Sequence, residues 1–295
     1  TGHRSPAGSL KTGRNTYSRE VVAYRIAQLE KVGVIQGYTC DINFFNIGYS
    51  SYTLALRLSD IDQKKINTLK ARSRVAYLQR VMGRFDLTCT ILFKDQTDLE
   101  GEYDFILKLF QKDLLDLETD MFLGDIDFSA NFFLDQDTEI DFRKQGEVDL
   151  SDYQVKVLRQ LVKGSRLSIV EMAKRLNISA PTVKKIISAL KKRKVILANR
   201  AIINFQKIGF HRYTLLLQMD PSVQSKLVQF ARGHPLIWDI GKYAGVSNFV
   251  IEILAKDNAE FESIVSKIRT QFRDSLQKID HLIVLEELKH EYFSV

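Results

Sequence analysis

The chain repeats itself, and this repeat constrains its fold more than any other feature. When the sequence is shifted against itself by 161 residues, Ser18–Leu58 aligns with Ser179–Met219 without a gap, and 16 of 41 positions are identical. Chance would give roughly a twentieth to a tenth of identical positions, so the match predicts a tandem duplication. A looser match continues beyond it, where Gly83 falls opposite Gly245. We therefore expect two copies of one unit, with the boundary near residue 145.

Composition limits the class of protein. A length of 295 residues suits two to four small domains, and 45% hydrophobic residues can supply several packed cores. Cys40 and Cys89 are the two cysteines, too few for a disulfide framework, and no apolar run is long enough to span a membrane. The chain also begins without the apolar stretch of a secretory signal. These features predict a cytoplasmic protein.

The start of the second copy has the pattern of three short helices. We expect the first from Ser151, the second from Ser168 to Asn177, and the third after Ser179, because each follows a capping side chain. The third helix places apolar residues at the spacing of one helical face: Val183, Ile186, Ile187 and Leu190. An extended wing is expected over residues 197–205.

Positive charge is concentrated in the same segment. Residues 163–200 contain eleven lysines and arginines and one acid, Glu171, within a chain of net charge +7. A solvated helix normally mixes the two signs, whereas an unbalanced basic face suits contacts to DNA phosphates. The pattern therefore predicts a helix-turn-helix whose third helix reads a DNA groove.

The segment that follows changes from a helical period to a two-residue period. Tyr213, Leu215 and Leu217 alternate with Thr214, Leu216 and Gln218, which is the two-residue period of a strand with one strongly apolar face. Further strands and helices give the order βαββαβ, which the first copy repeats from Tyr52 to Phe133. A ferredoxin-like sheet of this kind leaves one face without helices. We expect the two apolar faces to pack against each other within one chain.

Two strings of the first copy carry a family resemblance. The run from Ser18 to Tyr38, SREVVAYRIAQLEKVGVIQGY, and the run from Gly83 to Asp86, GRFD, closely resemble the Lrp/AsnC (leucine-responsive) regulators of bacteria and archaea. The resemblance implies a winged helix-turn-helix joined to a βαββαβ domain, called a RAM domain, that dimerises and can bind amino acids. Two successive copies of this organisation together account for nearly the whole chain. The resemblance therefore implies a tandem-duplicated form of the archaeal type.

The predicted organisation is α+β, with two tandem units. We expect a first winged helix-turn-helix at 1–48, a first ferredoxin-like domain at 49–145, a second winged helix-turn-helix at 146–209 and a second ferredoxin-like domain at 210–295. The first helix-turn-helix is expected to be incomplete at its N-terminus, with residues 4–12 as a remnant of its second helix.

The resemblance implies two sets of site residues. Those expected to contact DNA are Arg14, Arg19, Tyr24, Arg25, Gln28, Thr182, Lys184, Lys185, Ser188, Lys191, Lys192 and Arg200. Those expected at an effector site for an amino acid or a related small molecule are Gly83, Arg84, Asp86, Gly245 and Asn248. The second copy departs from the family there, because it has Gly245-Val-Ser-Asn248 where the family prefers an aromatic residue and Asp.

Other functions leave weaker signals. The five histidines have no paired spacing, so we expect no metal site. The sequence also contains no glycine-rich phosphate-binding loop, and we expect no cofactor. Siroheme decarboxylases resemble the same family, but residues 199–213 offer only His211 and Arg212 as candidates for a tetrapyrrole site. The sequence-based expectation is therefore a DNA-binding transcription regulator that is not an enzyme. A nucleoid-organising protein is the third possibility that the basic helices leave open.

Overall fold

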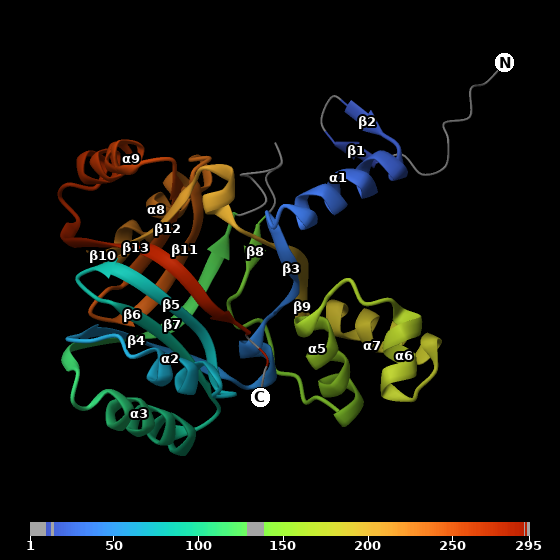
Figure 1. Cartoon of the computed structure of the whole chain (residues 1–295). Helices are drawn as coiled ribbons and strands as arrows, with labels where there is room; N and C mark the ends of the chain where they lie inside the picture. The colour runs from blue at the N-terminus through green and yellow to red at the C-terminus, as the bar shows by residue number, and fades with distance from the viewer. Residues whose placement is uncertain (1–9, 13–14, 129–138, 292, 294–295) are drawn as a thin grey trace.

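Two runs of the order βαββαβ form the larger part of the structure (Figure 1). In this computed structural model, residues 10–12, 15–128, 139–291 and 293 are described. The first run consists of β4 Ser50–Leu58, α2 Gln63–Lys70, β5 Val75–Gly83, β6 Leu87–Phe93, α3 Gln96–Phe110 and β7 Leu114–Asp127. The second consists of β10 His211–Met219, α8 Gln224–Arg232, β11 Ile237–Gly245, β12 Phe249–Ala255, α9 Asn258–Gln271 and β13 Leu276–His290, with a short 3-10 turn at Pro221–Val223.

The two runs join edge to edge into one closed sheet. Among the described residues the strand order is β11-β12-β10-β13-β5-β6-β4-β7, and β7 pairs again with β11 and with the short strand β8, Ile140–Asp141. At one seam Gly83 of β5 pairs with Leu282 of β13, and at the other Asp127 of β7 pairs with Asp239 of β11. The last strand of each half thus extends across the other half.

Helices cover the outside of the closed sheet, and its inside is lined by polar side chains together with an apolar cluster around Phe85 and Leu282. Leu54 and Leu56 of β4 are fully buried in a core with residues of α2 and α3, and Leu215 and Leu217 of β10 are buried against α8 and α9. The expectation that these leucines, with Tyr52 and Tyr213, face the opposite sheet is therefore wrong. The helices of each half take the apolar face, and the alternate positions, such as Thr53 and Thr214, point inward.

The predicted helix-turn-helix of the second half forms as α5 Asp152–Lys163, α6 Ile169–Leu176 and α7 Ala180–Lys192. The Ser168 and Ser179 side chains accept hydrogen bonds from the backbone N–H groups of Glu171 and Thr182, which satisfies free donors of the first turns. Asn177 ends α6 in the left-handed conformation. The three helices share one small core, whose fully buried members include Val157, Leu158, Met172, Val183 and Leu190.

In the first half one helix, α1 Arg19–Lys31, stands where the second half has three. It follows a hairpin of β1 Leu10–Thr12 and β2 Asn15–Tyr17, so the expected helical remnant is a strand over its described residues. None of the residues of α1 is buried. The structure thus gives this helix no core like that of α7, because no helices corresponding to α5 and α6 are present in the described residues.

A two-stranded ladder connects the two helical parts. It pairs β3, Ile35–Ile42, with β9, Ile196–Ile203, and Thr39 lies opposite Arg200. These two residues are equivalent under the 161-residue shift, so the ladder has the self-complementary contacts of a two-fold interface. The expected extended wing forms as strand β9 over most of its length and pairs with β3. The two strands continue into the 3-10 turns Phe44–Ile47 and Phe205–Ile208. In Figure 1, α1 and α5 to α7 lie to the same side of the closed sheet. Among the described residues, no helix is long and apolar enough to cross a membrane.

Candidate DNA-binding surface and interior cavity

The basic face of α7 is exposed. We define this face by six exposed side chains, four lysines and two hydroxyl residues: Thr182, Lys184, Lys185, Ser188, Lys191 and Lys192. Val183 and Leu190 on the opposite face are fully buried in the core of the three helices. The division is the one expected for a groove-reading helix, because the core fixes its orientation while the polar face stays free.

Further cations extend this surface. Lys174 and Arg175 of α6 and Arg193 and Lys194 after α7 are exposed. Arg175 forms an ion pair of 2.6 Å with Glu171, an exposed pair that leaves the excess of positive charge in place. The basic face of α7 therefore lies within a wider positive surface.

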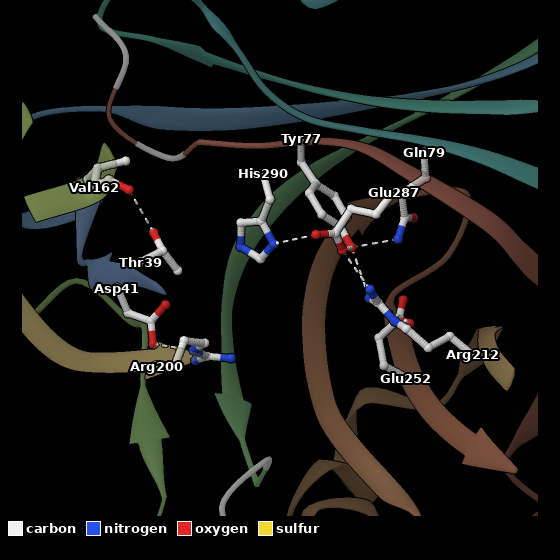
Figure 2. A network of polar contacts seen from close by, with 10 residues as sticks. All are labelled: Thr39, Asp41, Tyr77, Gln79, Val162, Arg200, Arg212, Glu252, Glu287 and His290. Atoms are coloured by element: carbon white, nitrogen blue, oxygen red, sulfur yellow. Dashed lines mark hydrogen bonds and ion pairs between the residues drawn. The ribbon is translucent and has the colours of Figure 1, made fainter. Parts of the chain in front are cut away.

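Arg200 does not belong to that surface. Its guanidinium contacts Asp41 at 2.5 Å (Figure 2). It also contacts Asp127 at 2.8 Å, and its side chain is 20% exposed. Burial alone would lower the pKa of Arg200, but the two carboxylates raise it. The arginine joins β9, β3 and β7 at the base of the helical part. We therefore leave Arg200 out of the candidate DNA surface.

The predicted contact residues of α1 are also exposed. Arg19, Tyr24, Arg25 and Gln28 all face solvent, and Tyr24 is 66% exposed. The Arg25 guanidinium lies 4.7 Å from the ring centroid of Tyr17, a cation–π contact within the same part of the chain. Arg14 lies outside the described residues. The structure thus brings four predicted residues onto one helix, where all four side chains are exposed.

The predicted effector residues do not come together in a pocket. Asp86 accepts a hydrogen bond of 2.8 Å from Leu58 N–H, and Asn248 accepts one of 2.9 Å from Met219 N–H, so each ties a turn to a strand end. Gly83 lies against Leu282, whereas Gly245 lies against Asp120 at the other seam. Arg84 forms ion pairs with Asp116 and Glu118. These positions shape turns and seams, and their polar atoms are already engaged.

A cavity of about 170 Å³ lies inside the closed sheet, which sequence reasoning missed. Both halves contribute to it, and so do β3 and β9. Its polar lining residues are Asp41, Ser51, Thr53, Tyr77, Gln79, Thr88, Thr90, Glu118, Asp120, Asp125, Asp127, Arg200, Arg212, Thr214, Asp239, Tyr243, Glu252 and His290. A buried space with this many polar groups differs from a hydrophobic core and is a candidate ligand site.

On one side of the cavity a network surrounds Arg212. This guanidinium donates to Glu287 at 2.7 Å and to the Tyr77 hydroxyl at 2.9 Å, and it lies 3.5 Å from Glu252 (Figure 2). His290 Nδ1 lies 3.1 Å from Glu287. Although burial raises the pKa of the Glu287 carboxyl, His290 and Arg212 together hold it well below its usual range. The Glu287 carboxylate is therefore ionised and has Arg212 and His290 as partners.

Two further carboxyl groups have no such partners. Asp125 lies on β7 and Asp239 on β11, the strands of one seam. The Asp125 Oδ1 atom is buried without a hydrogen-bond partner. The Asp239 carboxyl forms no hydrogen bond or ion pair with a described side chain, and Arg212 only partly offsets its burial. Burial raises the pKa of both carboxyls well above the usual range. The sequence signal was the acidic alternation Asp125, Asp127 within an apolar strand, which marks an inward polar face.

Sequence comparison relates the helical part to known regulators. A family described as winged helix-turn-helix DNA-binding matches residues 150–196, which contain α5, α6 and α7. The leucine-responsive regulatory protein of Rhizobium meliloti (strain 1021) is 24% identical over 147 residues, 48% of this chain and 93% of that protein. An uncharacterized helix-turn-helix-type transcriptional regulator of Pyrococcus abyssi (strain GE5 / Orsay) is 32% identical over 77 residues, 25% of this chain and 52% of that protein. The chain is thus similar to bacterial and archaeal regulators alike.

Structural comparison covers more of the chain, and the matched structure is that of an enzyme. The siroheme decarboxylase NirDL has a TM-score of 0.65 at 15% identity, and the match covers 93% of this chain and 84% of that one. The same enzyme in co-complex with an iron-uroporphyrin III analogue has a TM-score of 0.64. At this identity the likeness shows a shared fold. The expectation that the chain is not an enzyme is therefore wrong, because this fold over nearly the whole length also serves catalysis.

Proposed function

We propose that this chain is a sequence-specific DNA-binding transcription regulator of the leucine-responsive type. The observation that carries the proposal is the basic face of α7, which is exposed while Val183 and Leu190 anchor the helix in its core. Lysines so placed can neutralise DNA phosphates, and Thr182 and Ser188 can reach base edges when the helix lies in the major groove.

The proposal includes a division into two tandem units, each with a reading helix. The 161-residue repeat and the pairing of Thr39 with Arg200 support an internal two-fold arrangement, in which α1 and α7 take the places of the two reading helices of a dimer. One chain would then supply the complete DNA-binding unit that single-unit proteins obtain by dimerisation. A response to a small effector would act through the ladder of β3 and β9, which connects these two helices.

The experiment is DNA selection with the purified full chain, followed by binding measurements at several salt concentrations. Replacing Lys184, Lys185, Lys191 and Lys192 by Ala should weaken binding and reduce the log–log salt slope by up to about 3.6, since each phosphate contact contributes about 0.9. A matched control replaces four exposed lysines on the helices outside the closed sheet: Lys64, Lys70, Lys226 and Lys267.

The control has the same change of net charge, so the two variants separate a local interface from a general electrostatic effect. Equal loss in both variants, or an unchanged slope in the α7 variant, would remove these lysines from the DNA interface. Binding that stays non-specific at moderate salt would instead favour the nucleoid-organising alternative.

A siroheme decarboxylase is the second candidate, and the fold likeness over 93% of the chain is the observation in its favour. The cavity supports it less well. Its volume of about 170 Å³ is close to the roughly 150 Å³ of an engineered cavity that holds benzene, and a tetrapyrrole is several times larger than benzene. An absorbance titration with siroheme tests this candidate directly, because a bound tetrapyrrole would shift its absorption bands and a decarboxylase would convert it.

A further inference from the structure

The interior cavity is strongly acidic, although the chain as a whole is basic. Its lining contains seven carboxylate side chains against two arginines and one histidine. Arg200 is shared by Asp41 and Asp127, and Arg212 is shared by Glu252 and Glu287. The cations present are therefore already engaged. An anionic ligand would meet unfavourable charge here, whereas a cation would meet favourable charge.

Asp125 and Asp239 are two carboxyl groups of this lining that form no ion pair with a described side chain, and a bound cation would favour their ionised forms. Asp239 pairs in register with Asp127, so Asp125 is its diagonal neighbour on the same face, at a Cα separation of roughly 7–8 Å. The buried Oδ1 atom of Asp125 has no partner in the described part of the chain. A buried acceptor left unsatisfied costs about 1–3 kcal/mol, so a donor that binds at this place would be favoured.

The size and the lining limit the kind of cation. No group of three metal-ligating side chains close enough to hold a metal ion occurs among the described residues. The volume is near that of a cavity that holds benzene, which is ample for an organic cation of about five or six heavy atoms. Trp238, Tyr243 and Phe122 also line the cavity, and aromatic faces attract organic ammonium groups.

We propose that the cavity binds a small organic cation, a protonated primary amine, with Asp125 and Asp239 as its anionic partners. The amine would donate to the free Asp125 oxygen and to Asp239, while its alkyl part lies against the aromatic side chains. Because β3 and β9 contribute Asp41 and Arg200 to the same cavity, the bound amine would lie beside the ladder that connects α1 and α7.

The electrostatics of the empty cavity support a change in protonation on binding. Burial raises the pKa of Asp125 and of Asp239, so without a cation these groups hold protons at pH values where exposed carboxyls are ionised. An ammonium group would favour the ionised forms. Binding should therefore release protons and become tighter as the pH rises, until the amine itself loses its proton near its own pKa of about 10.

The test is isothermal titration calorimetry of the full chain with three probes of similar size: n-butylammonium, 1-butanol and butyrate. Binding is expected for n-butylammonium alone, and repeating it in buffers of different ionisation heat should reveal proton release. Asp125→Asn and Asp239→Asn should each weaken binding at least tenfold. Asp104→Asn is the control, since Asp104 is exposed on α3 outside the cavity and pairs with Lys108.

Each other outcome counts against the proposal. Binding of 1-butanol or butyrate as tight as that of n-butylammonium, no binding of n-butylammonium, or unchanged affinity in both Asn variants would overturn it. Competition by potassium chloride at equal concentration would assign the site to an inorganic ion instead. Circular dichroism and thermal unfolding of the Asn variants establish that they fold. Because no DNA is present, the result is independent of the proposed function.

Discussion

At the scale of the residue, the inside of the closed sheet contains buried carboxyl groups, and burying a carboxyl group without a partner destabilises the folded state. Asp125 and Asp239 face a cavity that shields them from bulk water, and each lies among other carboxylates. Arg200 and Arg212 form ion pairs with neighbouring carboxylates. They lower the pKa of Asp125 and Asp239 only in part, and neither of these two carboxyls forms an ion pair with a described side chain. A chain that retains such groups bears a stability cost, which is the usual sign of a functional site.

This cost predicts a pH-dependent effect of Asp125→Asn. Below a pH of about 4, both the folded and the unfolded wild type hold the proton, and the charge of Asp125 costs nothing. As the pH rises toward the raised folded-state pKa, the unfolded state loses the proton first, so the wild type loses up to about 1.4 kcal/mol of stability per pH unit. The variant has no such loss. Chemical denaturation from pH 4 to 8 should show its stability relative to wild type increasing with pH; a constant difference would contradict the raised pKa.

At the scale of the element, the sequence predicted much of the secondary structure but not the packing of the strands. Caps at Ser168 and Ser179 and the spacing of Val183 and Leu190 located the helices, because those signals are local. The period of two also located β4 and β10. Which face of a strand points inward depends on the helices and on the strand across the seam, so Leu54 was assigned to the wrong side and the cavity was missed.

The seam between β5 and β13 depends on Gly83, as two matched glycine substitutions can test. Gly83 has φ of +143°, and a Cβ atom there would lie 2.8 Å from the backbone oxygen of His281. Gly83→Ala should therefore destabilise the fold by about 1–3 kcal/mol. Gly101 lies within α3 and a Cβ there meets open space, so Gly101→Ala should stabilise the fold by about 0.5–1 kcal/mol. Thermal unfolding of both variants measures the contrast, and equal shifts would mean that the seam tolerates a side chain.

At the scale of the whole molecule, a two-fold arrangement combines two chemically different halves. Val22, Ile26 and Leu29 are identical to their counterparts Val183, Ile187 and Leu190, so α1 and α7 share the same apolar spacing. The solvent-facing positions differ. Arg19 lies opposite Ala180 and Tyr24 opposite Lys185 under the repeat. The charge is also divided in space, with a basic surface on α7 and an acidic interior in the closed sheet.

This divergence predicts an asymmetric operator. On α1, Arg19, Arg25 and Gln28 offer directional donors to base edges, whereas α7 presents mainly lysines, which act as point charges toward phosphates. Selection from random DNA should yield one informative half-site beside a nearly degenerate one, separated by roughly one helical turn or a multiple of it.

Exchanging segments between the two helices tests which of them carries the sequence preference. When residues 18–31 are replaced by the sequence of residues 179–192, the preference should disappear while non-specific affinity remains, because the replacement supplies lysines in place of directional side chains. The reciprocal exchange, which places residues 18–31 in the position of α7, is the control for folding and for total charge. It should create information in the second half-site, since α7 is held by a complete helical core. A palindrome with equal information in both halves of the wild-type operator would refute the division of roles and would favour a pair of chains that each use the same helix.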